Sequence, residues 1–331
     1  MITPRHLLRI QDLSAEEIRS LLDLAEALKR GEGSSTSLAG RCIGLLFNVP
    51  STRTRVSFQV AAAQLGAVSL PYGTQELRLA NRESIEDTIG VLNRYLDALV
   101  VRWYDMNEPG AGHERLRQMA DLARIPVINA LDDEEHPCQV LADLLTLREL
   151  FGADAASRRI AYVWSYSPRQ KTPGVLHSSM MAAALLGHRA TIAHPPGFAP
   201  REKVTRSARA IAARSGGDIT LTENLEEAVK GCAAVYTLSW KSAVLTGQEE
   251  IQARTRLAGR WRVTAPLMRQ ASDGEEAVFL DCMPTTRGEE VDAEVKDGPR
   301  SRIFQQAENR LHTQKALLTQ LFDGTLRGEP R

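Results

Sequence analysis

Short β-type runs alternate with helical segments through most of this 331-residue chain, and this alternation restricts its fold more than any other feature. The runs expected to form strands are 43–47, 98–101, 127–130, 160–164, 190–194, 219–222, 233–238 and 278–280. Apolar residues recur every three or four positions over 14–29, 83–95, 114–123, 138–150, 175–186, 200–214 and 224–230. Strands that alternate with helices build parallel sheets covered on both faces, so we predict an α/β fold.

The chain is too long for one comfortable core, which favours two domains. The pattern restarts after the long helix that follows His136, because that helix ends at Gly152 and a new strand begins at Ile160. We therefore predict two Rossmann-like, three-layer domains joined by interdomain helices. The first spans 1–150 and the second 151–306, and the C-terminal segment 307–331 is expected to pack back on the first.

Charge and cysteine usage exclude several classes of function. Lys+Arg and Asp+Glu both number 41, and this zero net charge argues against nucleic acid or a membrane surface as the main partner. The four cysteines are scattered, without the C-x-x-C spacing of a zinc site, and suit a reducing compartment. The N-terminus lacks a long apolar or an Arg/Ser-rich targeting stretch, so we expect a cytoplasmic enzyme.

The segment S-T-R-T-R at 51–55 is the first candidate binding site. It lies between the strand 43–47 and a helix that begins V-S-F-Q, which is where open α/β sheets bind ligands. Free N–H groups at the helix start, the hydroxyls of Ser51, Thr52 and Thr54, and a guanidinium all favour an anion. The alternative is a solvated helix start with Ser51 as N-cap and arginines at the surface.

Two further strand ends carry polar groups. Arg102 directly follows the strand D-A-L-V-V, and His136 and Gln139 follow V-I-N-A and open the next helix. A single Arg or His at a strand end is usually structural. Three strand ends that supply hydroxyls, Arg, His and Gln together indicate one crevice that suits an anion with a polarised carbonyl group.

With these residues in place, the chain resembles the aspartate/ornithine carbamoyltransferases, and the ornithine branch most of all. The resemblance rests on S-T-R-T-R, E-S-I-E-D-T, R-Y-L-D-A-L-V-V-R, H-P-C-Q-V-L-A-D, C-M-P-T-T-R-G-E-E-V and A-E-N-R-L-H-T-Q-K-A-L-L, in order over nearly the whole chain. It implies a carbamoyl-phosphate domain, an amino-acid domain, a homotrimer and a place in arginine biosynthesis.

The resemblance also implies roles for individual residues. Ser51, Thr52, Arg53 and Thr54 would hold the phosphate, and Arg102 would bridge phosphate and carbonyl oxygen. His136 and Gln139 would contact the carbamoyl group, and Cys282 and Arg287 would sit beside the reacting carbon. Thr54, Arg102 and His136 would stabilise the oxyanion that forms when a neutral amine attacks. The leaving phosphate can accept the proton, so no metal or organic cofactor is expected, and Cys282 is not expected to act as a covalent nucleophile.

The amino-acid side departs from the ornithine pattern at several places. Leu238 stands where an Asp is usual, the proline-marked loop 164–174 replaces an Asp-Gly-Asn-Asn stretch, and Asp281 replaces a His before Cys282. The loop, and Ser239-Trp240 after it, look more like the branch that acts on N-acylated ornithines. We expect Leu131, Asp281, Trp240 and Lys241 to contact the acceptor. Asp281 is a hypothetical substitute for the missing acid, although an N-cap or surface Asp is an equal alternative.

Several questions stay open at this point. Arg169 and Lys171 are further candidates to bind a substrate carboxylate, and Arg82 is a candidate to reach a neighbouring subunit. The acceptor is either ornithine itself or an N-acylornithine or other amine. A rival from another class is a non-catalytic protein that binds carbamoyl phosphate, which the losses at 164–174 and 238 would suit. The retention of Cys282, Pro284 and Arg287 argues against that rival.

Overall fold

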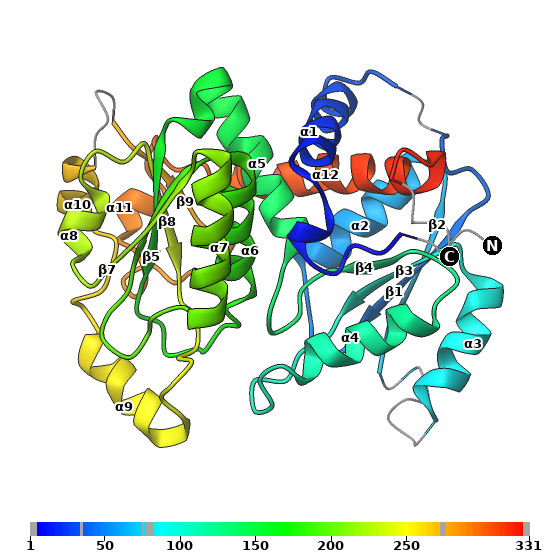
Figure 1. Ribbon diagram of the computed structural model, residues 1–331, viewed down its shortest axis with the longest axis horizontal. Coiled ribbons are helices and arrows are strands. Elements are labelled where there is room, and N and C mark those ends of the chain that lie inside the picture. Colours follow the sequence, from blue (N-terminus) through cyan, green and yellow to red (C-terminus); the bar gives the residue numbers. More distant parts are fainter. Residues whose placement is uncertain (1–4, 34–35, 75, 77–82, 272–275, 327–331) are drawn as a thin grey trace. The chain divides into compact units, whose positions relative to one another are not determined.

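A computed structural model describes residues 5–33, 36–74, 76, 83–271 and 276–326 (Figure 1). Arg82 lies outside these described residues. The chain divides into two compact units: unit 1 comprises Met1–Leu145 and Glu308–Arg331, and unit 2 comprises Thr146–Ala307. It passes from one unit to the other within two helices, α5 (Pro137–Phe151) and α12 (Ile303–Asp323).

Unit 1 is built on a four-stranded parallel sheet in the order β2-β1-β3-β4. The strands are β1 (Cys42–Phe47), β2 (Val68–Gly73), β3 (Ala98–Arg102) and β4 (Val127–Asn129). Helices α3 (Ile85–Tyr95) and α4 (Ala111–Leu122) cover one face, and α1 (Ala15–Lys29), α2 (Arg53–Gln64) and α12 lie on the other (Figure 1). Leu46, Leu99 and Val101 are buried between the sheet and the α3–α4 layer.

Unit 2 has a five-stranded parallel sheet in the order β7-β6-β5-β8-β9. Its strands are β5 (Arg159–Trp164), β6 (Arg189–Ala193), β7 (Asp218–Thr222), β8 (Ala234–Leu238) and β9 (Val278–Leu280). Its helices are α6 (Gly174–Leu186), α7 (Glu202–Ser215), α8 (Leu225–Val229), α9 (Gly247–Leu257), α10 (Ala265–Gln270) and α11 (Ala293–Lys296). The predicted fold, two α/β units with parallel sheets, is confirmed.

Every expected strand is present to within one residue at each end. The predicted helix start at Ser14 is confirmed as well, because its hydroxyl accepts the Glu17 N–H at 3.1 Å and the Glu17 carboxylate accepts the Ser14 N–H at 2.7 Å. Strand β2 was not expected. It contains Pro71, and proline is tolerated there because β2 is the edge strand of its sheet.

Three short helices of unit 2, α9, α10 and α11, were also not expected. The buried residues of α9 are Glu250 and Arg254, so its inward face is ionic and leaves no apolar periodicity in the sequence.

The helices of the described part of the chain include none with the length and apolar character that crossing a membrane requires.

Candidate functional site

The carboxyl ends of β1, β3 and β4 meet at one edge of the unit 1 sheet. The strands are in register with Phe47 opposite Arg102 and Val101 opposite Asn129. Backbone hydrogen bonds continue past the strands, since Asn48 N–H donates to Arg102 O at 3.0 Å and Trp103 N–H donates to Leu131 O at 3.0 Å. The three segments that follow these strands are therefore held side by side, at the edge where parallel sheets bind ligands.

The S-T-R-T-R segment leads into α2, which begins at Arg53. Thr52 is the N-cap residue, with helical dihedral angles, and its side chain makes no capping hydrogen bond. Ser51 is not the N-cap, so the N-cap role considered for it is wrong. Thr54 is buried at 1% exposure, whereas Ser51 and Arg53 are half-buried and Thr52 is exposed.

The positive charges of three arginines act on His136 in unit 1. The imidazole is buried, and its pKa lies well below the ordinary value because burial disfavours the charged ring and Arg310, Arg102 and Arg53 repel a further positive charge. His136 is therefore neutral at physiological pH. Arg102 also stacks on Tyr104, with its guanidinium carbon 5.4 Å from the ring centre.

Arg310 is the member of this cluster that sequence reasoning missed. It lies on α12, is buried at 3% exposure, and donates a hydrogen bond to the Thr54 hydroxyl. The signal was present in the A-E-N-R-L-H motif, but no spacing rule connects a helix near the C-terminus with a turn 256 residues earlier.

The other expected residues of unit 1 lie on the loop and helix after β4. Gln139 is buried in the first turn of α5, and its amide nitrogen donates to Asp143 at 2.8 Å. Leu131 has a positive φ of 123°, a conformation that non-glycine residues rarely adopt. Burial raises the pKa of the neighbouring Cys138 thiol to about 12, so Cys138 stays protonated and is a poor nucleophile.

In unit 2, Cys282 is half-buried and lies just after β9. The Asp281 carboxylate is buried and accepts the Met283 N–H, which shapes the turn that contains Cys282. Burial raises the pKa of Asp281, although the positive charge of Lys171 opposes that rise. Asp281 is thus neither a surface residue nor a helix N-cap.

Lys171 is engaged rather than solvated. Its ammonium group donates to Pro284 O at 2.7 Å and to the buried Glu290 carboxylate at 2.9 Å. Burial lowers the pKa of Lys171, but Asp281 and Glu290 outweigh this and raise it above its ordinary value. The loop 164–174 is in this way joined to the turn that follows Cys282.

The remaining predicted residues of unit 2 have other neighbours. The exposed Arg287 forms a two-bond ion pair with Asp297, with both N–O distances 2.6 Å. Trp240 is buried, and its indole N–H donates to Phe198 O at 2.8 Å. Lys241 is half-buried, and its backbone N–H donates to Lys171 O at 2.8 Å. Substrate contacts of these three residues stay predictions.

The structure thus brings together two groups of predicted residues. One, in unit 1, consists of Arg53, Thr54, Arg102 and His136 with the added Arg310. The other, in unit 2, consists of Lys171, Asp281 and Cys282. Across the described ranges, no three His, Cys, Asp or Glu side chains gather in a way that would hold a metal ion.

Comparisons with known proteins match both halves of the chain. Residues 5–149 match the family model "Aspartate/ornithine carbamoyltransferase, carbamoyl-P binding domain", and residues 157–321 match "Aspartate/ornithine carbamoyltransferase, Asp/Orn binding domain". The ornithine carbamoyltransferase of Parafrankia sp. is 41% identical, with 99% of each chain covered. That of Gloeobacter violaceus is 42% identical, with 96% of each chain covered.

Solved structures agree with these matches. The crystal structure of the Gloeobacter violaceus ornithine carbamoyltransferase has a TM-score of 0.81 at 39% identity, covering 97% of this chain and 99% of that one. A structure of N-acetyl-L-ornithine transcarbamylase with carbamyl phosphate and N-succinyl-L-norvaline has a TM-score of 0.88 at 30% identity, covering 96% and 99%.

Proposed function

The chain belongs to the aspartate/ornithine carbamoyltransferase family and is a transferase enzyme, and from this premise we propose that it carbamoylates the terminal amine of ornithine. Carbamoyl phosphate is the donor, and citrulline and phosphate are the products. The observation that carries the proposal is the cluster in unit 1, where Arg310 donates to the Thr54 hydroxyl and the charges of three arginines act on a buried, neutral His136.

Unit 1 is proposed to bind carbamoyl phosphate at the start of α2. The phosphate accepts the free N–H groups of the first helical turn and the hydroxyls of Ser51, Thr52 and Thr54. Because Thr52 makes no capping bond, its hydroxyl is not committed to the helix end. Arg53 and Arg102 supply charge-assisted hydrogen bonds to the phosphate, and Arg102 extends to the carbonyl oxygen.

The carbamoyl group is assigned to Thr54, Arg102, His136, Gln139 and Arg310. A neutral imidazole can donate one hydrogen bond to the developing oxyanion without needing to lose a proton. Removing one such donor typically raises the barrier by about 3 kcal/mol. The Gln139 amide nitrogen donates to Asp143 at 2.8 Å, and the Gln139 oxygen is proposed to accept from the carbamoyl NH₂ group.

The amine must lose its proton before it attacks, because an alkylammonium ion has a pKa of about 10.4. Once the neutral amine has attacked, its nitrogen gives up a second proton, and the departing phosphate accepts that one, so the scheme calls for no cofactor. Unit 2 is proposed to bind the acceptor. Cys282 is proposed to lie next to the reacting carbon, and Leu131 is proposed to contact the acceptor. Asp281, Trp240 and Lys241 remain the proposed acceptor residues, and Asp281 also shapes the turn that contains Cys282.

An N-acylornithine is the second candidate acceptor. Its support is the TM-score of 0.88 with an N-acetyl-L-ornithine transcarbamylase and the hydrophobic Leu238, since an acylated α-amine carries no positive charge to be paired. The test is a panel of ornithine, N-acetylornithine and lysine, each assayed for carbamoyl transfer. We expect ornithine to give the highest kcat/KM, by about tenfold or more.

Other outcomes of this panel discriminate between the rivals. Preference for N-acetylornithine would change the acceptor and leave the carbamoyl-phosphate site intact. Phosphate release that no amine accelerates would favour the non-catalytic binding protein instead.

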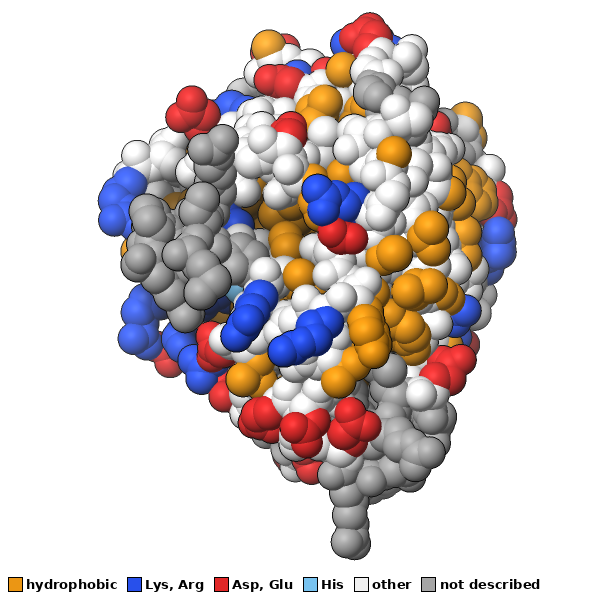
Figure 2. Space-filling view, turned by 90° about the vertical axis from the view of Figure 1, so that its right-hand side faces the viewer, with side chains coloured by type: hydrophobic (Ala, Val, Ile, Leu, Met, Phe, Trp, Pro, Cys, Tyr) orange, Lys and Arg blue, Asp and Glu red, His pale blue; other side chains and the backbone are white. Residues whose placement is uncertain are grey.

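We further propose a homotrimer that works in arginine biosynthesis in the cytoplasm, with small molecules as its only other partners. Exposed hydrophobic side chains gather on the side of unit 1 that contains β2 and α3 (Figure 2). The exposed large hydrophobic side chains of α2, β2 and α3 include Val56, Val60, Val68, Leu70, Val91 and Tyr95. Exposed apolar side chains that gather on one side of a protein are typical of subunit interfaces. Light scattering measures the molar mass of the wild-type protein and of Val68→Asp. The variant should form an assembly with fewer subunits than the wild type.

A further inference from the structure

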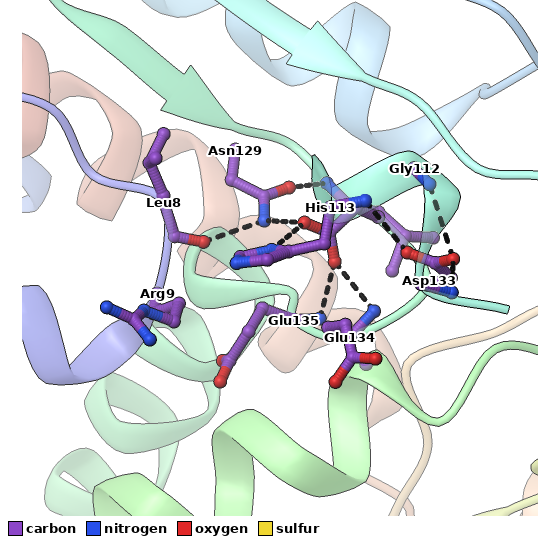
Figure 3. Close-up of polar contacts among 12 residues, drawn as sticks. Leu8, Arg9, Gly112, His113, Asn129, Asp133, Glu134 and Glu135 are labelled. Atoms are coloured by element: carbon purple, nitrogen blue, oxygen red, sulfur yellow. Dashed lines mark hydrogen bonds and ion pairs between the residues drawn. The ribbon is translucent and has the colours of Figure 1, made fainter. Parts of the chain in front are cut away.

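The loop 130–136, which connects β4 to α5, is organised around the buried carboxylate of Asp132. One oxygen accepts the backbone N–H groups of Glu134 and Glu135, at 2.7 Å and 2.6 Å. The other accepts the Asn129 amide at 2.9 Å and is 2.7 Å from His113 Nδ1. Figure 3 shows His113 and Asn129 pointing toward this turn from α4 and β4.

Asn129 connects the Asp132 carboxylate to Leu131 through hydrogen bonds. Its amide nitrogen also donates to Leu8 O at 2.7 Å, and its amide oxygen accepts the Leu131 N–H at 2.9 Å (Figure 3). Leu131 has a φ of 123°, which costs about 1–3 kcal/mol for a non-glycine residue and persists only where neighbours enforce it. Through Asn129, the Asp132 carboxylate takes part in enforcing it.

The same carboxylate fixes the approach to His136. The Asp132 N–H donates to Glu135 O at 3.0 Å, so the turn 132–135 is closed by both the backbone and the side chain of Asp132. His136 follows immediately and precedes α5. An ionised carboxylate has only acceptor atoms, so it can accept a hydrogen bond from each of the four nitrogens. An amide or a protonated acid carries an N–H or O–H of its own, which would face a donor group at one of these four contacts.

We propose that Asp132 is a positioning residue for carbamoyl transfer, holding the loop 130–136 so that Leu131 and His136 keep their reactive geometry. This inference rests on the proposed function. It assigns Asp132 no contact with substrate, because four protein nitrogens already occupy the hydrogen-bonding positions of its buried carboxylate. His113 is assigned the role of the cation that keeps Asp132 ionised.

The electrostatics of the pair support this assignment. Burial raises the pKa of Asp132 to about 6, while the hydrogen bond and charge of His113 oppose a larger rise. The hydrogen bond to Asp132 in turn raises the pKa of His113. The other charged groups that face the pair are Arg9, Asp133, Glu134 and Glu135 (Figure 3). As pH falls through about 6, Asp132 takes up a proton, and the loop loses an acceptor it needs.

The test compares Asp132→Asn with a matched control, Asp97→Asn. Asp97 also accepts a backbone N–H and a guanidinium, from Cys42 and Arg41, but it lies at the amino end of β3, at the opposite edge of the same sheet. We expect Asp132→Asn to lower kcat by about 30-fold while KM for carbamoyl phosphate changes by less than about threefold. Amide hydrogen exchange at Glu134 and Glu135 should accelerate by about tenfold or more. Asp97→Asn should change none of these.

His113→Gln provides a second variant, which keeps a neutral donor near the carboxylate. At pH 8 it should retain kcat within about threefold. Without the imidazolium, the pKa of Asp132 should rise. The fall of kcat at low pH, which is the acid limb of its pH profile, should therefore begin at a pH higher by about one unit. A merely structural role would lower the melting temperature and leave that limb in place.

Two results would overturn the inference: a folded Asp132→Asn with wild-type kcat and wild-type amide exchange, or an acid limb unmoved in His113→Gln. Failure of the proposed function looks different. A wild-type protein that carbamoylates no amine would remove the kinetic readout, while amide exchange in the 130–136 loop would still show whether Asp132 orders it.

Discussion

Arg310, on the last helix, donates a hydrogen bond to the hydroxyl of Thr54, in the turn that opens α2. The two residues are 256 positions apart in the chain. Because Arg310 is also close enough to His136 to depress its pKa, α12 contributes directly to the cluster proposed to bind the carbamoyl group. The C-terminal helix is therefore expected to matter for chemistry as well as for packing.

Arg310→Gln should lower kcat by about 100-fold, because it removes a guanidinium from the cluster that is proposed to stabilise the oxyanion. Arg287→Gln should cost less, since Asp297 already neutralises that guanidinium in an exposed ion pair. Steady-state kinetics of the two variants side by side distinguish them. Lys315→Gln, which removes a positive charge from the same helix, is the matched control. A larger loss for Arg287→Gln would reverse the assignment.

Lys171→Met should destabilise the protein by about 3 kcal/mol, because it leaves the buried Glu290 carboxylate without this ammonium partner. It should also lower kcat by about tenfold, since Lys171 holds Pro284 O in the segment that follows Cys282. Urea unfolding and kinetics measure the two effects. Arg169→Met removes only an exposed hydrogen bond to Thr286 from the same loop and should cost less than about 1 kcal/mol. Equal effects of the two substitutions would argue against a special role for Lys171.

Acid should destabilise the protein through His177. This side chain is fully buried in α6, and burial lowers its pKa to about 4. The unfolded chain takes up a proton near pH 6.5 that the folded chain accepts only near pH 4. The contribution is therefore intact above pH 6.5 and falls by about 3 kcal/mol as the pH drops to about 4. Urea unfolding across this range should show a shallower decline in His177→Leu, and parallel declines would count against the assignment.

Cys282 should be the thiol that substrate protects. It is half-buried, as is Cys42, whereas Cys138 and Cys232 are buried. Iodoacetamide at pH 8, followed by peptide mass spectrometry, should label Cys282 and Cys42 and leave Cys138 unmodified, because the pKa of Cys138 is raised to about 12. A bisubstrate analogue should protect Cys282 alone. Cys282→Ser should retain measurable transfer, since the proposed chemistry has no covalent intermediate; complete loss would contradict that.

Much of the fold was predictable because its strands are short apolar runs that end at polar residues. The strand ends also indicated the site, since side chains placed after parallel strands converge whatever the rest of the chain does. Strand β2 was not predicted, because it contains Pro71 and lies partly exposed at the edge of the sheet. It therefore lacks the continuous apolar run that indicates a buried strand. Helix α9 was not predicted, because the side chains that it buries are the ion pair of Glu250 and Arg254, whose N–O distance is 2.9 Å, and not apolar residues.

The parts of the site that were missed depend on tertiary contacts. In the sequence, Asp132 belongs to the run D-D-E-E, which resembles a solvated loop, and only the structure shows its carboxylate fully buried among four donors. Lys171 likewise resembles a surface lysine until Glu290 and Pro284 are placed beside it. Arg310 could be quoted as part of a motif, but its partner Thr54 could not be identified from helix periodicity.

The most direct test of the central claim is calorimetric titration with phosphonoacetamide, a stable analogue of carbamoyl phosphate. The account predicts one binding site per chain in the wild type, and affinities weaker by about tenfold or more in Arg53→Gln and in Arg102→Gln, because each substitution removes a charge-assisted contact. Undiminished affinity in both variants would contradict it, since the anion would then bind somewhere other than the strand ends of unit 1.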